Sequence, residues 1–215
     1  MNNLNSFLRD RYKTGLFVIL VLHTVGLVGL LSPWYDVFLR LTPATLLVSV
    51  LLLIRGWEHI SLRLWMGIAA VFALGWGVEY LGAEHGLVFG NYDYGTVLGP
   101  GPAGVPLLIG VNWVLVIFGA HALSSSFDLP APLRIGLGAA FAVVLDVAIE
   151  PVAVHLGFWT WQNNEIPLSN YVGWFGVSAL LIWAVERLVG PTRNGLARAL
   201  FLVMFAFFGI LAMIL

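Results

Sequence analysis

The sequence predicts an all-α integral membrane protein, a single transmembrane domain over 1–215 built as a bundle of about seven helices. Two observations support this fold class. Of the 215 residues, 60% are hydrophobic and only 10% are charged, whereas soluble domains contain about 25% charged residues. The apolar residues also fall into long runs, and a helix needs roughly 20 of them to cross a hydrocarbon core of about 30 Å.

Seven apolar runs qualify as spans, and most end at Gly, Pro or Ser residues that interrupt helices. The second run is short, and the fifth contains two acids. The first follows Arg9, Arg11 and Lys13, as in a signal peptide, but it lacks a small-residue cleavage site, so we interpret it as an uncleaved helix. The runs are 14–31, 37–54, 62–82, 105–124, 133–151, 171–189 and 196–215.

The basic residues predict how the helices are oriented. Lys and Arg gather in cytoplasmic segments of membrane proteins. In this chain they lie in the amino-terminal tail and then in every second loop, with Arg40 as the exception. We therefore expect a cytoplasmic amino terminus, an external carboxy terminus and a multi-pass location in the plasma (inner) membrane. The remaining basic residues are Arg55, Arg63, Arg134, Arg187, Arg193 and Arg198.

Two polar, aromatic intervals begin near the ends of the third and fifth runs. The first begins at Glu79 and continues through a stretch rich in Gly and Pro, and the second begins at Asp146. We expect a re-entrant or lid-like loop near 85–104, which is tolerable at membrane depth only if protein covers it.

The two intervals also resemble each other. Glu79 precedes His85 and later Asn112, and Glu150 precedes His155 and later Asn170. Helix hairpins over 62–124 and 133–189 could therefore be pseudo-repeats with a site at their interface. The spacings differ between the halves, so chance or convergence explains the likeness about as well as duplication.

Four carboxylates are candidate catalytic residues: Glu79, Asp93, Asp146 and Glu150. Asp146 and Glu150 are four positions apart and share one helix face. Acids inside spans are functional candidates by default, although they can simply fix helix packing through a basic partner. Neither interval contains Lys or Arg. Without cations, clustered acids keep at least one proton near neutrality, and a neutral carboxyl can serve as a general acid. Asp93 could instead be an ordinary turn residue.

The side chains that flank these acids are candidate substrate-binding residues. Trp and Tyr gather at membrane interfaces in any case, but here they could also line a slot for a long apolar ligand and stabilise a cation with their ring faces. The histidines could be proton carriers, metal ligands or interface residues. The candidates are Trp76, His85, Tyr92, Tyr94, Asn112, Trp113, His155, Trp159, Trp161, Asn170 and Trp174.

Several functions are disfavoured. No HExxH motif or Gly-rich phosphate loop occurs, so we expect no metal and no nucleotide site. No basic run supports a nucleic-acid partner. The single lysine, Lys13, precedes the first apolar run, which excludes a retinal Schiff base within the bundle.

At these residues the sequence resembles the membrane carotenoid-biosynthesis family that includes the γ-carotene and bisanhydrobacterioruberin hydratases. The resemblance covers about 70–185. It is carried by Glu79, Gly82 and His85-Gly, then Phe89-Gly-Asn-Tyr-Asp-Tyr, Leu98-Gly-Pro, Gly104-Val-Pro-Leu, Asp146, Glu150-Pro-Val-Ala, Gly157-Phe-Trp-Thr-Trp and Ile166-Pro-Leu-Ser-Asn-Tyr-Val-Gly-Trp.

This resemblance implies a carotenoid 1',2'-hydratase, which adds water to the terminal double bond of a linear carotenoid end and leaves a tertiary 1'-hydroxyl. The expected partners are the carotenoid, water, membrane lipid and a downstream carotenoid glycosyltransferase. Chemistry suggests that Asp146 or Glu150 protonates C2', and that Glu79 or Asp93 activates the water that attacks C1'. No cofactor is expected.

Two other functions remain open from the sequence. A carotenoid or lipid carrier would use the acids as polar contacts between helices. A carotenoid isomerase or cyclase would form the same cation but exclude water.

Overall fold

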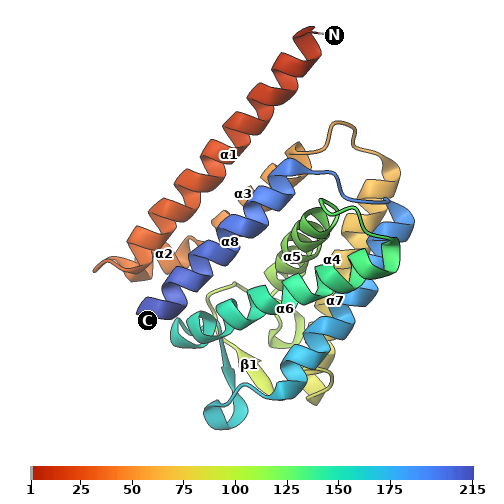
Figure 1. Ribbon diagram of the computed structural model, residues 1–215. Coiled ribbons are helices and arrows are strands. Elements are labelled where there is room, and N and C mark those ends of the chain that lie inside the picture. The colour runs from red at the N-terminus through yellow and green to blue at the C-terminus, as the bar shows by residue number, and fades with distance from the viewer. Residues whose placement is uncertain (1) are drawn as a thin grey trace.

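The computed structural model describes residues 2–215, and side chains from Asp10 onward, so the Arg9 side chain lies outside the described residues. Within this range the chain forms eight α-helices (Figure 1). They are α1 (Asn2–Leu30), α2 (Tyr35–Arg40), α3 (Thr42–Arg55), α4 (Leu62–His85), α5 (Leu108–Ser124), α6 (Ala131–His155), α7 (Leu168–Leu188) and α8 (Gly195–Ile214).

The prediction of an α-helical membrane protein is confirmed. Five helices are long and apolar enough to cross a membrane: the Asp10–Leu30 part of α1, then α4, α6, α7 and α8. The other two main helices are shorter, with 14 residues in α3 and 17 in α5. The predicted second run is divided at Leu41 between α2 and α3. Pro43 lies in the first turn of α3, where its missing N–H leaves no helical hydrogen bond unmade.

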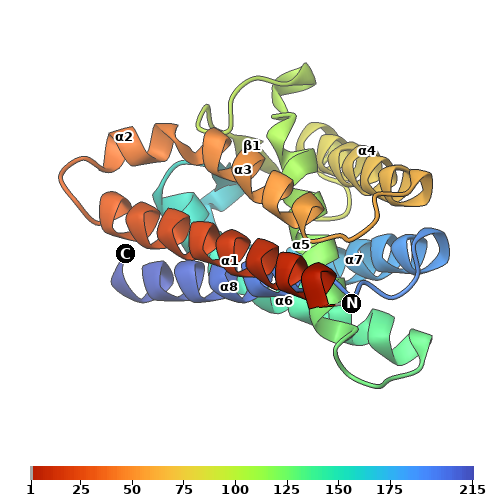
Figure 2. The same ribbon diagram turned by 90° about the horizontal axis from the view of Figure 1, so that it is seen from above.

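Helix α5 occupies the centre of the bundle. It contacts α3, α4, α6, α7 and α8, and Figure 2 shows it surrounded by them. Every residue from Trp113 to Ala122 is buried. A helix that is apolar on all sides belongs in an interior, which is where α5 lies.

The basic segments gather at one end of the bundle. Arg11 Nη2 donates to the Arg55 carbonyl at 3.2 Å, and both residues line the same hollow as Arg193. The carboxy terminus lies at the other end, away from the amino terminus (Figure 1). The chain therefore concentrates basic residues at one end, and the aromatic loops with their acids lie at the other.

A buried polar network ties three helices together near the basic end. Glu186 of α7 accepts hydrogen bonds from Arg134 of α6 through Nε, at 3.2 Å, and Nη2. His121 Nε2 of α5 lies 2.7 Å from the same carboxylate, and its Nδ1 lies 2.9 Å from Thr192 Oγ1. Removing one partner of such a pair leaves an uncompensated charge, so this network fixes the packing of α5, α6 and α7.

A two-stranded ribbon joins the two polar loops, and the all-α prediction did not include it. Strand β1 (Tyr92–Tyr94) pairs antiparallel with β2 (Trp159–Trp161), so that Tyr92 lies opposite Trp161 and Tyr94 opposite Trp159. Successive side chains of a strand point to opposite faces. The Tyr and Trp side chains thus share one face, which is directed at α4 and α6. The loop predicted near 85–104 contains β1 and a 3₁₀ turn, Pro102–Gly104.

Candidate active site

Glu79 on α4 accepts hydrogen bonds from three aromatic side chains. Its Oε2 accepts from the Tyr92 hydroxyl at 2.5 Å and the Tyr94 hydroxyl at 2.6 Å, and its Oε1 accepts from the Trp113 indole at 2.8 Å. The side chain is 6% exposed. Hydrogen bonds to a carboxylate are worth about 1.5–3 kcal/mol each, so this donor set fixes the position of both oxygens.

Glu150 on α6 has a matching donor set. Its Oε2 accepts from the indole N–H groups of Trp159, at 3.0 Å, and Trp161, at 2.8 Å. The Asn170 amide of α7 donates to Glu150 Oε1 at 3.2 Å and to Asp146 Oδ2 at 2.8 Å. The i, i+4 spacing of Asp146 and Glu150 does place both acids on one face, where Asn170 links them.

The ribbon brings these two donor sets together. Tyr92 and Tyr94, at the two ends of β1, donate hydrogen bonds to Glu79. Trp159 and Trp161, at the two ends of β2, donate hydrogen bonds to Glu150. In each case the strand follows the helix that carries the acid, and the next helix supplies the third donor. This arrangement has the form expected of the pseudo-repeats, although their origin by duplication stays a prediction.

Glu79 and Glu150 line one small cavity of about 20 Å³. A cavity needs roughly 10–15 Å³ of this kind of volume to hold a water molecule, so this acid cavity has room for one. Its walls include no Lys or Arg from the described part of the chain. The lining residues are Glu79, Phe89, Tyr92, Tyr94, Ile109, Asn112, Glu150, Trp159, Trp161, Asn170 and Trp174.

Phe89 and Trp174 line one side of the acid cavity, and Trp113 stacks on Trp174 from outside the lining. Trp113 and Trp174 stack with centroids 4.3 Å apart, and Phe89 lies 6.3 and 6.5 Å from them. Aromatic faces attract cations within about 6 Å of the ring centroid. The wall therefore offers electrostatic support to a positive charge while it excludes bulk water.

The phenols stay neutral donors. Burial first, and then the charge of Glu79, raises the pKa of Tyr92 and of Tyr94 above its usual value. Both hydroxyls can therefore donate to Glu79 across the neutral and mildly alkaline range.

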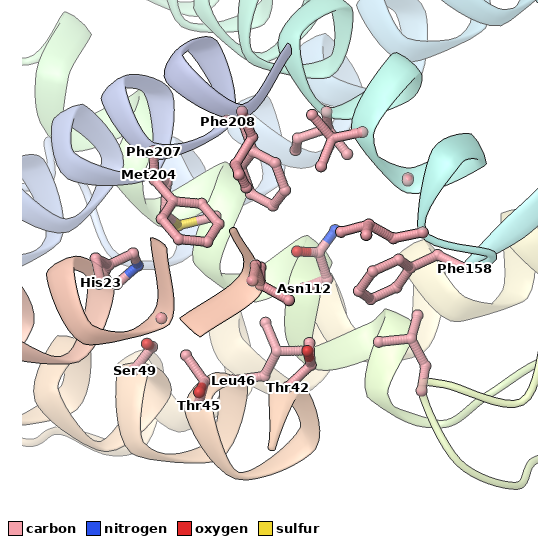
Figure 3. Close-up of a pocket in the computed structure, with 18 of the residues that line it drawn as sticks. His23, Thr42, Thr45, Leu46, Ser49, Asn112, Phe158, Met204, Phe207 and Phe208 are labelled. Carbon is pink, nitrogen blue, oxygen red and sulfur yellow. The ribbon is translucent and has the colours of Figure 1, made fainter. Parts of the chain in front are cut away.

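A larger apolar cavity of about 110 Å³, the slot, adjoins the acid cavity. It is formed by residues of α1, α2, α3, α5, α6 and α8 together with the loops around Leu98 and Phe158. Ile109, Asn112 and Trp159 line both cavities. In Figure 3, Asn112 lies in the middle of the slot, with His23 toward one end and Phe158 toward the other. The two cavities therefore meet at Asn112.

The predicted site residues separate into two groups. Most of them line the acid cavity. Trp113 lies outside the lining but donates to Glu79, and Asp146 shares its Asn170 partner with Glu150. Four lie outside it. Asp93 is exposed on the opposite face of β1 from Tyr92 and Tyr94, and His85 and His155 are exposed at helix ends. Trp76 donates to the Val105 carbonyl at 3.3 Å and stacks on Tyr80.

The sequence predicted a slot lined by the Trp and Tyr side chains near the acids, but among these candidates only Trp159 lines this cavity. Its walls come largely from α1, α3 and α8, whose Leu, Phe and Thr residues look like ordinary scaffold. His23 also lines the slot, and its Nδ1 lies 2.9 Å from the Ile19 carbonyl. Phe89 and Ile109 of the acid cavity were also missed, because neither carries a polar group that sequence reasoning could single out.

The described residues contain no group of three or more His, Cys, Asp or Glu side chains that could hold a metal ion. The donors around Glu79 and Glu150 are neutral N–H and O–H groups, which suit carboxyl oxygens. What the arrangement can do is move protons between two carboxyls and one water.

Gly75→Ala is expected to disturb this site without touching an acid. Gly75 lies one turn before Glu79, and a Cβ there would meet Trp113 Cγ at 2.5 Å. Displacing the indole would break its bond to Glu79, and overpacking of this kind costs about 1–3 kcal/mol. Thermal unfolding in detergent would show the loss. Gly77→Ala on the same helix is the matched control, because nothing lies within 4 Å of that Cβ; equal melting of the two variants would contradict the prediction.

Comparison with known proteins gives two findings. The carotenoid biosynthesis protein family matches this chain over residues 37–215. The chain is also 29% identical over 154 residues to the bisanhydrobacterioruberin hydratase of Haloarcula japonica, an alignment that covers 64% of this chain and 49% of that relative. The chain thus spans about half the length of the curated relative. No solved structure matches the chain.

Proposed function

The chain belongs to the carotenoid biosynthesis protein family, and from this premise we propose that it is a carotenoid 1',2'-hydratase. It adds water to the terminal double bond of a linear carotenoid end and leaves a tertiary 1'-hydroxyl. The observation that carries the proposal is the pair of carboxyls, Glu79 and Glu150, that share a one-water cavity next to an apolar slot, with three lining residues in common. The name of the Haloarcula relative supports the same reaction.

The two cavities suit the two reactants. The slot is mostly apolar and, at about 110 Å³, holds the branched tip of a linear isoprenoid, while the rest of the polyene stays in lipid. The acid cavity holds the water. The reacting carbons then lie where the cavities meet, beside Asn112 and Trp159.

Glu150 is the proposed proton donor. Ile149, Val152 and Ala153, which surround it on α6, line the slot, whereas α4 contributes no residue to the lining. Both indole N–H groups bind Oε2 of Glu150, so the proton is assigned to Oε1, which accepts one hydrogen bond, from Asn170, and has room for a hydrogen. Transfer of that proton to C2' places the positive charge on the tertiary carbon C1', which faces the Trp159 ring.

Glu79 is the proposed base. It takes one proton from the water as the water oxygen bonds to C1', and a proton shared between the two carboxyls then restores Glu150. Two carboxylates in one cavity without a cation repel each other when both are charged, which favours such sharing. General acid–base catalysis typically contributes about 10²–10⁴-fold, and the fixed dipoles around the cation add electrostatic stabilisation.

Asp146 has a positioning role in this proposal. It is fully buried and lines neither cavity, and its Oδ2 holds the Asn170 amide that also binds Glu150. Asp93 takes no part, because it faces away from the acid cavity. The protein needs no cofactor for these steps, since acid, base and water complete the reaction.

The membrane arrangement is also a proposal. The gathering of Arg11, Arg55 and Arg193 at one end supports a cytoplasmic amino terminus. Seven crossings, with α3 and α5 as short spans shielded by their neighbours, would then place the acid cavity toward the outside of the plasma membrane. There a glycosyltransferase could use the tertiary hydroxyl.

Isotope labelling tests the function. Purified protein in lipid nanodiscs is incubated with an acyclic-ended carotenoid in H₂¹⁸O, and the pigments are analysed by liquid chromatography and mass spectrometry. A hydratase gives a 1'-hydroxycarotenoid containing one ¹⁸O. Bound but unchanged pigment would indicate a carrier, and an unlabelled isomer or cyclic product would indicate an isomerase or cyclase; either result rejects the hydratase.

A further inference from the structure

The junction between the two cavities contains one unpaired polar side chain. Asn112 lines both cavities together with Ile109 and Trp159. It is half-buried on α5, and within the described part of the chain no hydrogen bond to its amide occurs. Leaving an amide unpaired in an apolar environment costs free energy. The other polar side chains of α5, His121 and Ser124, have partners.

The position of this amide matches a requirement of the proposed chemistry. The acid cavity has room for one water, and the slot next to it is apolar. The water must nevertheless reach a carbon in the slot. Ile109 offers no hydrogen bond, and the Trp159 N–H is already given to Glu150. Asn112 is the group at this boundary with both a donor and an acceptor to offer.

We propose that Asn112 is a positioning residue that holds the attacking water at C1' and so determines that the cation is captured by water. This inference rests on the proposed hydratase function. It adds that Asn112 determines which product the cation gives. The partner is a single water molecule at the junction, with Glu79 as its proton acceptor on the other side.

The cation at C1' has two fates once C2' has gained its proton. In the first, the water oxygen bonds to C1', one water proton passes to Glu79, and an alcohol results. In the second, a carbon next to C1' loses a proton to a carboxylate and a double bond re-forms, giving either the starting alkene or an isomer. Both routes balance without an oxidant or reductant. Holding a water at C1' accelerates the first route alone.

The test measures the partition between these fates. Wild type, Asn112→Leu and Asn112→Ser are incubated with an acyclic-ended carotenoid in D₂O containing ¹⁸O. The amount of alcohol with ¹⁸O measures the cations captured by water. The amount of recovered or isomerised alkene with deuterium measures the cations that lost a proton instead. We expect Asn112→Leu to lower the ratio of ¹⁸O-alcohol to deuterated alkene by up to about tenfold, the effect of one lost hydrogen bond. Total cation formation should change much less.

Asn112→Ser and Val111→Leu complete the experiment. Serine retains a hydroxyl that can bind water, so this variant should recover part of the wild-type ratio, and it serves if the leucine variant fails to fold. Val111 precedes Asn112 on α5 and lines neither cavity, so Val111→Leu should keep the wild-type ratio. An unchanged ratio in Asn112→Leu and Asn112→Ser, or an equal fall of both products, overturns the inference. A wild type without any ¹⁸O-alcohol instead rejects the hydratase function itself.

Discussion

Glu150→Gln is expected to lower the rate of 1'-hydroxycarotenoid formation by about 10²–10⁴-fold, the usual contribution of a general acid. Glutamine has nearly the same shape, and its carbonyl oxygen can still accept from Trp159 and Trp161. It cannot deliver a proton to C2'. The variant should therefore fold and bind pigment while the cation no longer forms, which single-turnover assays of purified protein in nanodiscs would show.

Asp146→Asn is the matched comparison for this prediction. It makes the same carboxyl-to-amide change one turn earlier on α6, at a residue that lines neither cavity. We expect less than about a tenfold loss, since it acts only through the hydrogen bond that Asn170 makes. If Asp146→Asn loses as much activity as Glu150→Gln, or if Glu150→Gln retains wild-type turnover, the assignment of the donor is wrong.

The sequence could predict that Glu79 and Glu150 belong to one site, for a physical reason. Each is an acid in an apolar helix with no cation nearby in the chain, and such a group can be buried only among neutral donors. The Tyr and Trp residues that follow each acid are those donors. Composition and spacing were therefore enough to predict the two acids and most of their hydrogen-bond donors.

The ribbon and the slot could not be predicted in the same way. A three-residue strand such as Trp159–Trp161 has too few positions to show a period, and its pairing with β1 is a tertiary contact. That pairing turns Asp93 outward and Tyr92 and Tyr94 inward. The slot depends on where α1, α3 and α8 pack against α5, and their apolar residues would look the same if they faced only lipid.

Gly26→Phe tests whether the slot receives the substrate. Gly26 lies on α1 and lines the slot, and a Cβ there would meet Phe207 Cε2 at 3.7 Å, an ordinary contact. The added ring would extend into a cavity of only about 110 Å³, so the isoprenoid tip would be excluded. We expect at least a tenfold fall in turnover and loss of pigment retained through purification, with both carboxyls and their donors unchanged.

Gly209→Phe separates blockage of the slot from the cost of placing a phenylalanine in this bundle. Gly209 lies on α8, nothing approaches its Cβ position within 4 Å, and it does not line the slot. Both variants exchange a helical glycine for the same side chain, which by itself favours the helix slightly. Only Gly26→Phe should lose pigment and activity. Equal activity in the two variants would mean that the carotenoid end reaches Glu150 by another path, and the roles assigned from the slot would have to be reversed or abandoned.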